Sequence, residues 1–179
     1  MAHRIKLIAA TTLTLSLGVA DIYARERPVR MTFSGSIVPT SIAVQANTIT
    51  DEELLEGHGA LGPFTFRKLR TDALAPQPSS ACPGLNIPVV AGGGVFRFQD
   101  GSLLTVLISE GGLCINLAAM VGHLTETYRI TGGTGRFSGA SGSLTSTATL
   151  RPVLVGSGGV VLLTSTGRFD GAVETRDEQ

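Results

Sequence analysis

Apolar and polar residues alternate with a period of two along most of the chain after residue 28. In the segment 124–131, for example, apolar side chains and threonines fall on opposite faces of an extended chain. Period two predicts β-strands of a half-exposed sheet, and threonine suits the outward face. Alternating or β-branched segments of this kind are Val29–Ile37, Val89–Phe98, Leu103–Ile108, Leu124–Thr131, Leu144–Leu150, Val160–Thr166 and Phe169–Val173.

Turn signals separate these segments. The sequence Gln99-Asp-Gly-Ser102 lies between two of the strands and predicts a hairpin centred on Asp-Gly. The segment Ala73–Pro83 holds three prolines and predicts a surface loop. Thr50–Glu56 carries acidic residues after a cap-like threonine, which leaves open one or two helical turns or a strand that begins at Leu54. Six to nine short strands without a convincing core helix indicate an antiparallel barrel or sandwich.

A glycine-rich segment, Tyr128–Gly142, forms a corner between two of these strands. Its glycines allow backbone conformations with positive φ or a close approach to a neighbouring strand. The structural residues of this glycine corner are Gly132, Gly133, Gly135, Phe137, Gly139 and Gly142.

With Ala140, the corner resembles the G-T-G-x-F-x-G-A-x-G stretch of allene oxide cyclase-like and dirigent-like β-barrels, which include uncharacterised secreted bacterial proteins. The resemblance is strongest from about Gly92 to Val173. It implies an all-β fold, a single antiparallel barrel of about eight strands. It also implies that a cavity can exist in which a reactive intermediate is steered. It transfers no catalytic residue, because the matched residues are structural, and the catalytic residues stay unknown.

The first 24 residues have the layout of a secretory signal peptide. Arg4 and Lys6 precede an apolar stretch, Leu7–Ala20, and Ala24 offers a cleavage site. We therefore expect a signal peptide over 1–24, a barrel domain over 25–179, and a secreted or periplasmic protein with no integral membrane segment after cleavage. Without Arg4, Lys6 and Asp21, the fourteen basic and fourteen acidic residues become twelve and thirteen. The sequence has no concentrated basic segment, so nothing in it indicates nucleic acid as a partner.

The two cysteines, Cys82 and Cys114, predict a structural disulfide in an exported protein. No cofactor and no metal site are expected, because the cysteines have no nearby histidine and the run Gly133–Ser138 lacks the third glycine of a dinucleotide fingerprint. His58 and His123 each lie beside glycine at an expected strand end, outside any metal or catalytic motif.

Glu126 is the most informative polar residue. By period two it shares the face of Leu124, Tyr128 and Ile130, so it is expected to point into the barrel. A carboxylate enclosed there has a raised pKa unless an arginine or a hydroxyl compensates. Glu126 and Tyr128 are therefore the candidate ligand-binding residues. A strand bulge, or a strand end open to water, is the competing explanation.

Three functions stay open. The sequence favours a non-catalytic exported barrel that binds an apolar small molecule or a protein partner, because it shows alternating strands and no catalytic constellation. The resemblance implies the second, a cyclase- or dirigent-like enzyme, which would be an isomerase. The third is a structural surface protein, a homo-oligomer formed through the barrel wall. A cavity open to solvent favours the first two, and a barrel filled by its own side chains favours the third.

Overall fold

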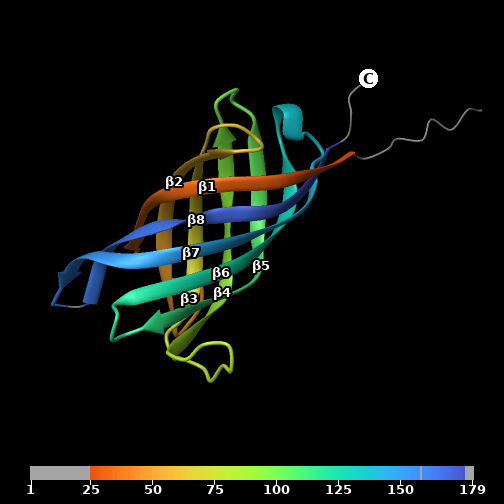
Figure 1. Cartoon of the computed structure of the whole chain (residues 1–179). Coiled ribbons are helices and arrows are strands. Elements are labelled where there is room, and N and C mark those ends of the chain that lie inside the picture. Colours follow the sequence, from red (N-terminus) through yellow and green to blue (C-terminus); the bar gives the residue numbers. More distant parts are fainter. Residues whose placement is uncertain (1–24, 158, 176–179) are drawn as a thin grey trace, which may run out of the picture.

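Eight antiparallel strands form a closed barrel in the computed structural model, which describes residues 25–157 and 159–175. Each strand pairs with the next along the chain, and the last strand pairs with the first (Figure 1). The expected all-β barrel is confirmed, whereas the expected signal peptide over 1–24 lies outside the described residues. The elements are β1 (Arg25–Pro39), β2 (Thr48–Gly59), β3 (Phe64–Ala73), β4 (Leu85–Phe98), β5 (Leu103–Asn116), β6 (Val121–Gly133), the 3-10 turn η1 (Gly135–Phe137), β7 (Ser141–Gly156) and β8 (Gly159–Thr175).

Three strands differ from the sequence expectation. The helical alternative for Thr50–Glu56 is wrong, because these residues lie in the middle of β2 and alternate between inward and outward positions. β3 was not expected as a strand at all. It pairs with β2 and β4 along its length, so its hydrogen bonds and burial come from neighbours distant in sequence. The two expected segments at 160–166 and 169–173 form the single strand β8.

The glycine corner closes one end of the barrel. Gly135, the first residue of η1, has a φ of +58°, in the left-handed region that favours glycine. Behind it, the ring of Phe137 lies inside the barrel end, 4.7 Å from the ring of Phe98. The guanidinium of Arg136 covers both rings from outside. The packed rings of Phe98 and Phe137 therefore close this end of the barrel.

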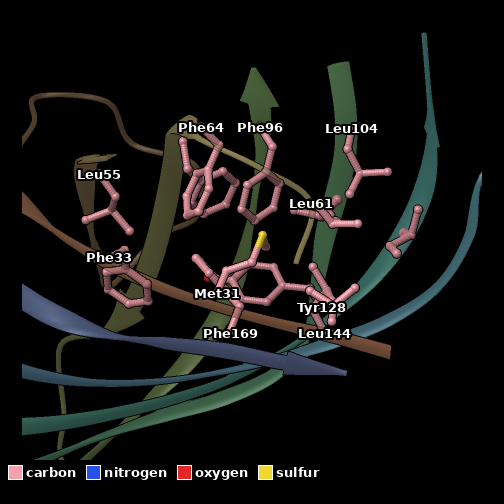
Figure 2. Packing of buried hydrophobic residues seen from close by; sticks show 14 of the residues in the cluster. Met31, Phe33, Leu55, Leu61, Phe64, Phe96, Leu104, Tyr128, Leu144 and Phe169 are labelled. Atoms are coloured by element: carbon pink, nitrogen blue, oxygen red, sulfur yellow. The ribbon is translucent and has the colours of Figure 1, made fainter. Parts of the chain in front are cut away.

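Aromatic side chains fill the barrel next to this corner (Figure 2). Phe66 stacks on Phe96, with ring centroids 4.0 Å apart, and Phe169 meets both rings edge-on. Phe33 and Phe64 extend the same cluster. This end of the interior is therefore occupied by the protein's own side chains.

The expected disulfide is confirmed between Cys82 and Cys114, whose Cα atoms lie 5.5 Å apart. It attaches the segment 74–84, which we call the disulfide loop, to the outside of β5. A disulfide is typical of proteins that fold outside the cytosol. None of the helical residues in the described ranges forms a segment long and apolar enough to cross a bilayer.

The ladder between β4 and β5 is interrupted beside the middle of β6. The two strands pair at Pro88–Gly112 and again at Gly93–Leu107. Between these points, residues 89–92 and 108–111 have no partner across the ladder, although all of them are within the described chain. We call this interruption the β4–β5 gap. β5 still pairs with β6 there, with Ile108 opposite Tyr128 and Gly111 opposite Glu126.

Candidate functional site

A cluster of charged side chains occupies the barrel beyond the aromatic groups. The inward positions of β3 begin with Phe64 and Phe66 and continue, with the same period of two, to Lys68 and Arg70. Lys68 is 2% exposed and Arg70 1% exposed. Lysine and arginine are almost never buried to this extent unless they are paired. The strand therefore carries two cations into a space where each needs a partner.

Carboxylates on β2 and β3 surround Arg70. In the register of these strands, Asp51 lies opposite Arg70 and Glu53 opposite Lys68. The Arg70 guanidinium donates to Glu53 Oε1 at 2.6 Å and to Asp51 Oδ2 at 2.8 Å, and its Nε donates to Asp72 at 2.9 Å. Buried hydroxyls of Thr50 and Thr71 lie 3.1 Å apart beside this group. The arginine is thus enclosed by three carboxylates.

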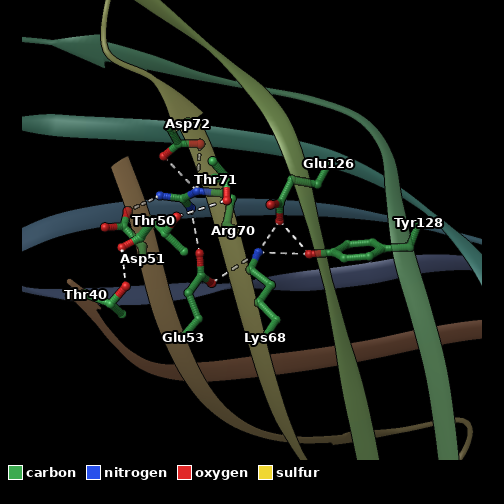
Figure 3. A network of polar contacts seen from close by, with 10 residues as sticks. All are labelled: Thr40, Thr50, Asp51, Glu53, Lys68, Arg70, Thr71, Asp72, Glu126 and Tyr128. Carbon is green, nitrogen blue, oxygen red and sulfur yellow. Dashed lines mark hydrogen bonds and ion pairs between the residues drawn. The ribbon is translucent and has the colours of Figure 1, made fainter. Parts of the chain in front are cut away.

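Lys68 connects this group to the two residues that the sequence singled out (Figure 3). Its ammonium donates to Glu126 Oε2 and to the Tyr128 hydroxyl at 2.9 Å, and it pairs with Glu53 Oε2 at 3.3 Å. The Tyr128 hydroxyl in turn donates to Glu126 Oε2 at 2.6 Å. Three strands, β2, β3 and β6, therefore meet at one ammonium group.

Glu126 points into the barrel, as its parity predicted, and is 0% exposed. The whole strand alternates, with Leu124, Tyr128 and Ile130 also buried. The two carboxylate oxygens of Glu126 differ in their partners. Oε2 accepts from Lys68 and Tyr128, whereas Oε1 accepts no hydrogen bond from any described residue. An enclosed acceptor without a donor is unfavourable, so Oε1 is the one unsatisfied carboxylate atom of this cluster among the described residues.

The charges of the cluster do not balance. Within the described part of the chain, two cations face four carboxyl groups, Asp51, Glu53, Asp72 and Glu126. Burial raises the pKa of Glu53, Asp51 and Asp72 above their ordinary values, despite the attraction of Lys68 and Arg70. The cluster therefore retains protons at a pH where exposed carboxyl groups have lost theirs.

Glu126 shows the opposite shift. Burial alone raises its pKa, but Lys68, Arg70 and the Tyr128 hydroxyl together outweigh it, and its pKa lies below the ordinary value. The compensation that the sequence left open is thus present, and the charge of Lys68 is its largest source. Burial and the negative charge of Glu126 also raise the pKa of Tyr128 well above its usual value, which keeps the phenol protonated. At neutral pH the pair is a carboxylate that accepts from a phenol.

Sequence reasoning found Glu126 and Tyr128 but missed Lys68, Arg70, Glu53 and the two aspartates. A signal was present, because the parity of Phe64 and Phe66 continues to residues 68 and 70. His58 and His123 are exposed and stand apart from the cluster. Arg129 and Arg136 lie at the surface. No group of three or more metal-ligating side chains occurs in residues 25–157 and 159–175.

A groove of about 1140 Å³ lies outside the barrel wall, between the disulfide loop and the outer faces of β5 and β6. Its lining includes Glu110, Gly111 and Gly112 on β5, and His123 and Thr125 on β6. Gly111 belongs to the β4–β5 gap and pairs with Glu126. The groove and the buried carboxylate are therefore on the two sides of the same stretch of wall.

No family model matches the chain, and no curated protein matches it in sequence. Among solved structures, the chain is similar to the pterocarpan synthase dirigent protein PsPTS1, with 14% identity, a TM-score of 0.48, and coverage of 86% of this chain and 97% of that one. It is also similar to the pterocarpan synthase dirigent protein GePTS1, with 13% identity, a TM-score of 0.45, and coverage of 93% and 100%. At these scores the similarities say nothing about what this chain binds.

Proposed function

We propose that this chain is a secreted or periplasmic barrel that binds a small, largely apolar molecule inside the barrel, at Glu126 and Tyr128. The unsatisfied Oε1 of Glu126 is the observation that carries the proposal. A ligand with one hydrogen-bond donor satisfies this oxygen, and Val89, which lies beside the stem of Glu126, offers an apolar contact for the rest of the ligand. The disulfide supports the extracytoplasmic location.

The binding of such a ligand requires side chains to move, because Glu126 is enclosed and the aromatic end is filled. A barrel interior filled by its own side chains also supports a second candidate, the structural surface protein. The outer wall of β2 to β5 also exposes apolar side chains at Leu54, Leu69, Val95 and Leu107. A homo-oligomer that covers this wall needs no ligand. The cyclase-like alternative has no specific observation in its favour beyond the contact between Tyr128 and Glu126.

Native mass spectrometry of protein purified from its own host separates these candidates. The binding function predicts one small molecule per chain, lost in Glu126→Gln and retained in Glu110→Gln, whose carboxylate lies on the outer wall. A ligand-free oligomer in the wild type contradicts the proposal and favours the structural protein. Turnover of the released molecule by fresh protein favours the enzyme.

A further inference from the structure

The hydrogen-bond donors of Lys68 and Tyr128 are already engaged within the cluster, and this limits the chemical class of the ligand. The Lys68 ammonium has three N–H groups. Its contacts with Glu126 Oε2, Glu53 and Tyr128 occupy them, so Lys68 cannot turn to Glu126 Oε1 without leaving a partner. The Tyr128 hydroxyl has one hydrogen, which it already gives to Oε2. A donor for Oε1 from outside the cluster therefore satisfies it at the least cost.

The charge of the cluster selects among possible donors. Among the described residues, four carboxyl groups face only two cations. A carboxyl group that keeps its proton can release it when a further cation enters, whereas an added anion meets no unpaired cation in this described cluster. A metal ion needs several ligands, and the described chain brings together no such set at this point. A protonated amine supplies both a positive charge and N–H donors in one small group.

The β4–β5 gap provides a route for it. Two apolar side chains close the gap from inside, and each lies over a glycine of the opposite strand. A Cβ atom on Gly92 of β4 would lie 2.5 Å from Cδ1 of Ile108, and a Cβ atom on Gly111 of β5 would lie 3.1 Å from Cγ2 of Val89. Ile108 and Val89 are only partly buried, although they face inward.

The gap leads to Glu126 directly. The same Cβ on Gly111 would lie 3.2 Å from Cγ of Glu126, so Val89 and the stem of Glu126 flank one point of the wall. Because no ladder hydrogen bonds join residues 89–92 to 108–111 in this described region, the rotation of two apolar side chains opens the wall without breaking the sheet. The groove under the disulfide loop lies outside this point.

The geometry points to an alkylammonium site, an inference that rests on the proposed function and specifies it. The ammonium group donates to Glu126 Oε1, the alkyl chain replaces Val89 and Ile108 in the β4–β5 gap, and the far end of the chain extends toward the outer groove. The ligand class is a primary amine on an unbranched apolar body. No covalent step is involved.

Three probes with the same six-carbon chain test the class: n-hexylammonium, 1-hexanol and hexanoate, each titrated calorimetrically into the disulfide-bonded protein at neutral pH. We expect hexylammonium to bind at least about tenfold more tightly than hexanol, because its charged N–H donor makes a stronger hydrogen bond to the Glu126 carboxylate than a neutral hydroxyl does. Hexanoate is expected not to bind. Equal affinity for hexylammonium and hexanol overturns the ammonium class.

Glu126→Gln and Glu126→Asp test the carboxylate. Both should weaken hexylammonium binding by about tenfold or more, whereas Glu110→Gln, at the outer groove, should change it by less than about twofold. The shorter Asp keeps a negative charge for Lys68, so it serves if the Gln variant does not fold. Loss of binding in Glu110→Gln alone places the amine at the surface and overturns the site.

Measurement of association rates tests the proposed entry route through the β4–β5 gap. Ile108→Ala should increase the association rate of hexylammonium, and Leu107→Ala, the outward-facing neighbour, should leave it unchanged. Equal rates in wild type and Ile108→Ala overturn entry through the β4–β5 gap. If native mass spectrometry finds a bound molecule while hexylammonium does not bind, the ligand class is wrong and the proposed function stands. If neither is observed, the proposed function fails as well.

Discussion

Lys68 connects the carboxylates of β2 to Glu126 and Tyr128 of β6. It contacts two carboxylates and a phenol, and its side chain is 1% exposed. Its neighbour Arg67 faces the other way, is 75% exposed, and pairs with Glu52 at 2.5 Å on the outer wall. The two residues therefore allow a buried ion pair to be compared with an ion pair that is exposed to water.

Lys68→Met should lower the free energy of unfolding by about 3–5 kcal/mol, because it leaves Glu126 buried without its paired cation and leaves Glu53 with Arg70 alone. Arg67→Met should change it by less than about 1 kcal/mol, since an exposed ion pair is screened by water. Urea unfolding of both variants measures the difference. Equal losses would show that the buried pair stabilises no more than the surface pair.

Glu53 determines the expected pH dependence of stability. It faces Lys68, Arg70 and Glu126, with Asp51, Asp72 and Tyr128 in the same cluster, and burial raises its pKa above the ordinary 4.5. Above pH 4.5 the unfolded chain has lost this proton while the folded chain keeps it. Stability therefore falls as pH rises from there through the folded pKa, by up to about 1.4 kcal/mol per pH unit for each retained proton.

Asp51 and Asp72 act in the same direction as Glu53, because their pKa values are also raised. Glu126 acts in the opposite direction: its pKa is lowered, so its contribution is lost as pH falls below the ordinary carboxyl range. The protein should be most stable at mildly acidic pH. Urea unfolding across pH should show a smaller slope for Glu53→Gln and an unchanged slope for the exposed Glu56→Gln. A wild-type stability that rises between about pH 5 and 7 contradicts the assignment.

At the scale of elements, the sequence predicted the strands whose inward faces are apolar and failed where charges face inward. β6 and β7 were recognised because Leu, Tyr and Ala recur at every second position. β3 was missed because its inward positions change from phenylalanine to lysine and arginine. In β2, the acidic residues Asp51 and Glu53 after Thr50 are compatible with a helix start as well as with a strand. The inward charged residues that made these strands hard to recognise belong to the buried cluster, and their burial is favourable only because they pair with one another.

One covalent bond, Cys82–Cys114, joins the disulfide loop to β5, and a backbone hydrogen bond from Gln77 to Asn86 joins it to β4. Cys82→Ala combined with Cys114→Ala should lower the free energy of unfolding by about 3–4 kcal/mol on the chain-entropy account. The loop amides should also exchange hydrogen faster, since the covalent attachment to β5 is lost. As a control, a reducing agent should bring wild type to the variant's stability and leave the variant unchanged. Full stability of the variant would mean that packing alone holds the loop.

At the scale of the whole molecule, the two ends of the barrel chain are neighbours. β1 pairs with β8 from Arg25 opposite Thr175 to Ile37 opposite Leu163. A short linker can therefore join residue 175 to residue 25. New ends can be opened in the turn at Asp100–Gly101, where Gly101 has a φ of +82° and lies at the surface.

This circular permutant should fold to the same barrel with a similar urea midpoint, because exposed turns tolerate new termini. A permutant opened between Thr127 and Tyr128, inside β6, should not fold, since it divides the strand that carries Glu126. Circular dichroism and urea unfolding compare the two. Equal behaviour of the two permutants contradicts the strand order on which the prediction rests.

The pairing of β1 with β8 also has a consequence for biosynthesis. β1 is synthesised before its partner β8, so the growing chain exposes the unpaired edge of β1 until β8, which ends at Thr175, has emerged. Contacts this distant in sequence form slowly. Until the barrel closes, we expect Lys68 and its carboxylates to remain in contact with water. The charged interior is then assembled while it is hydrated, and it is sealed when β8 pairs with β1.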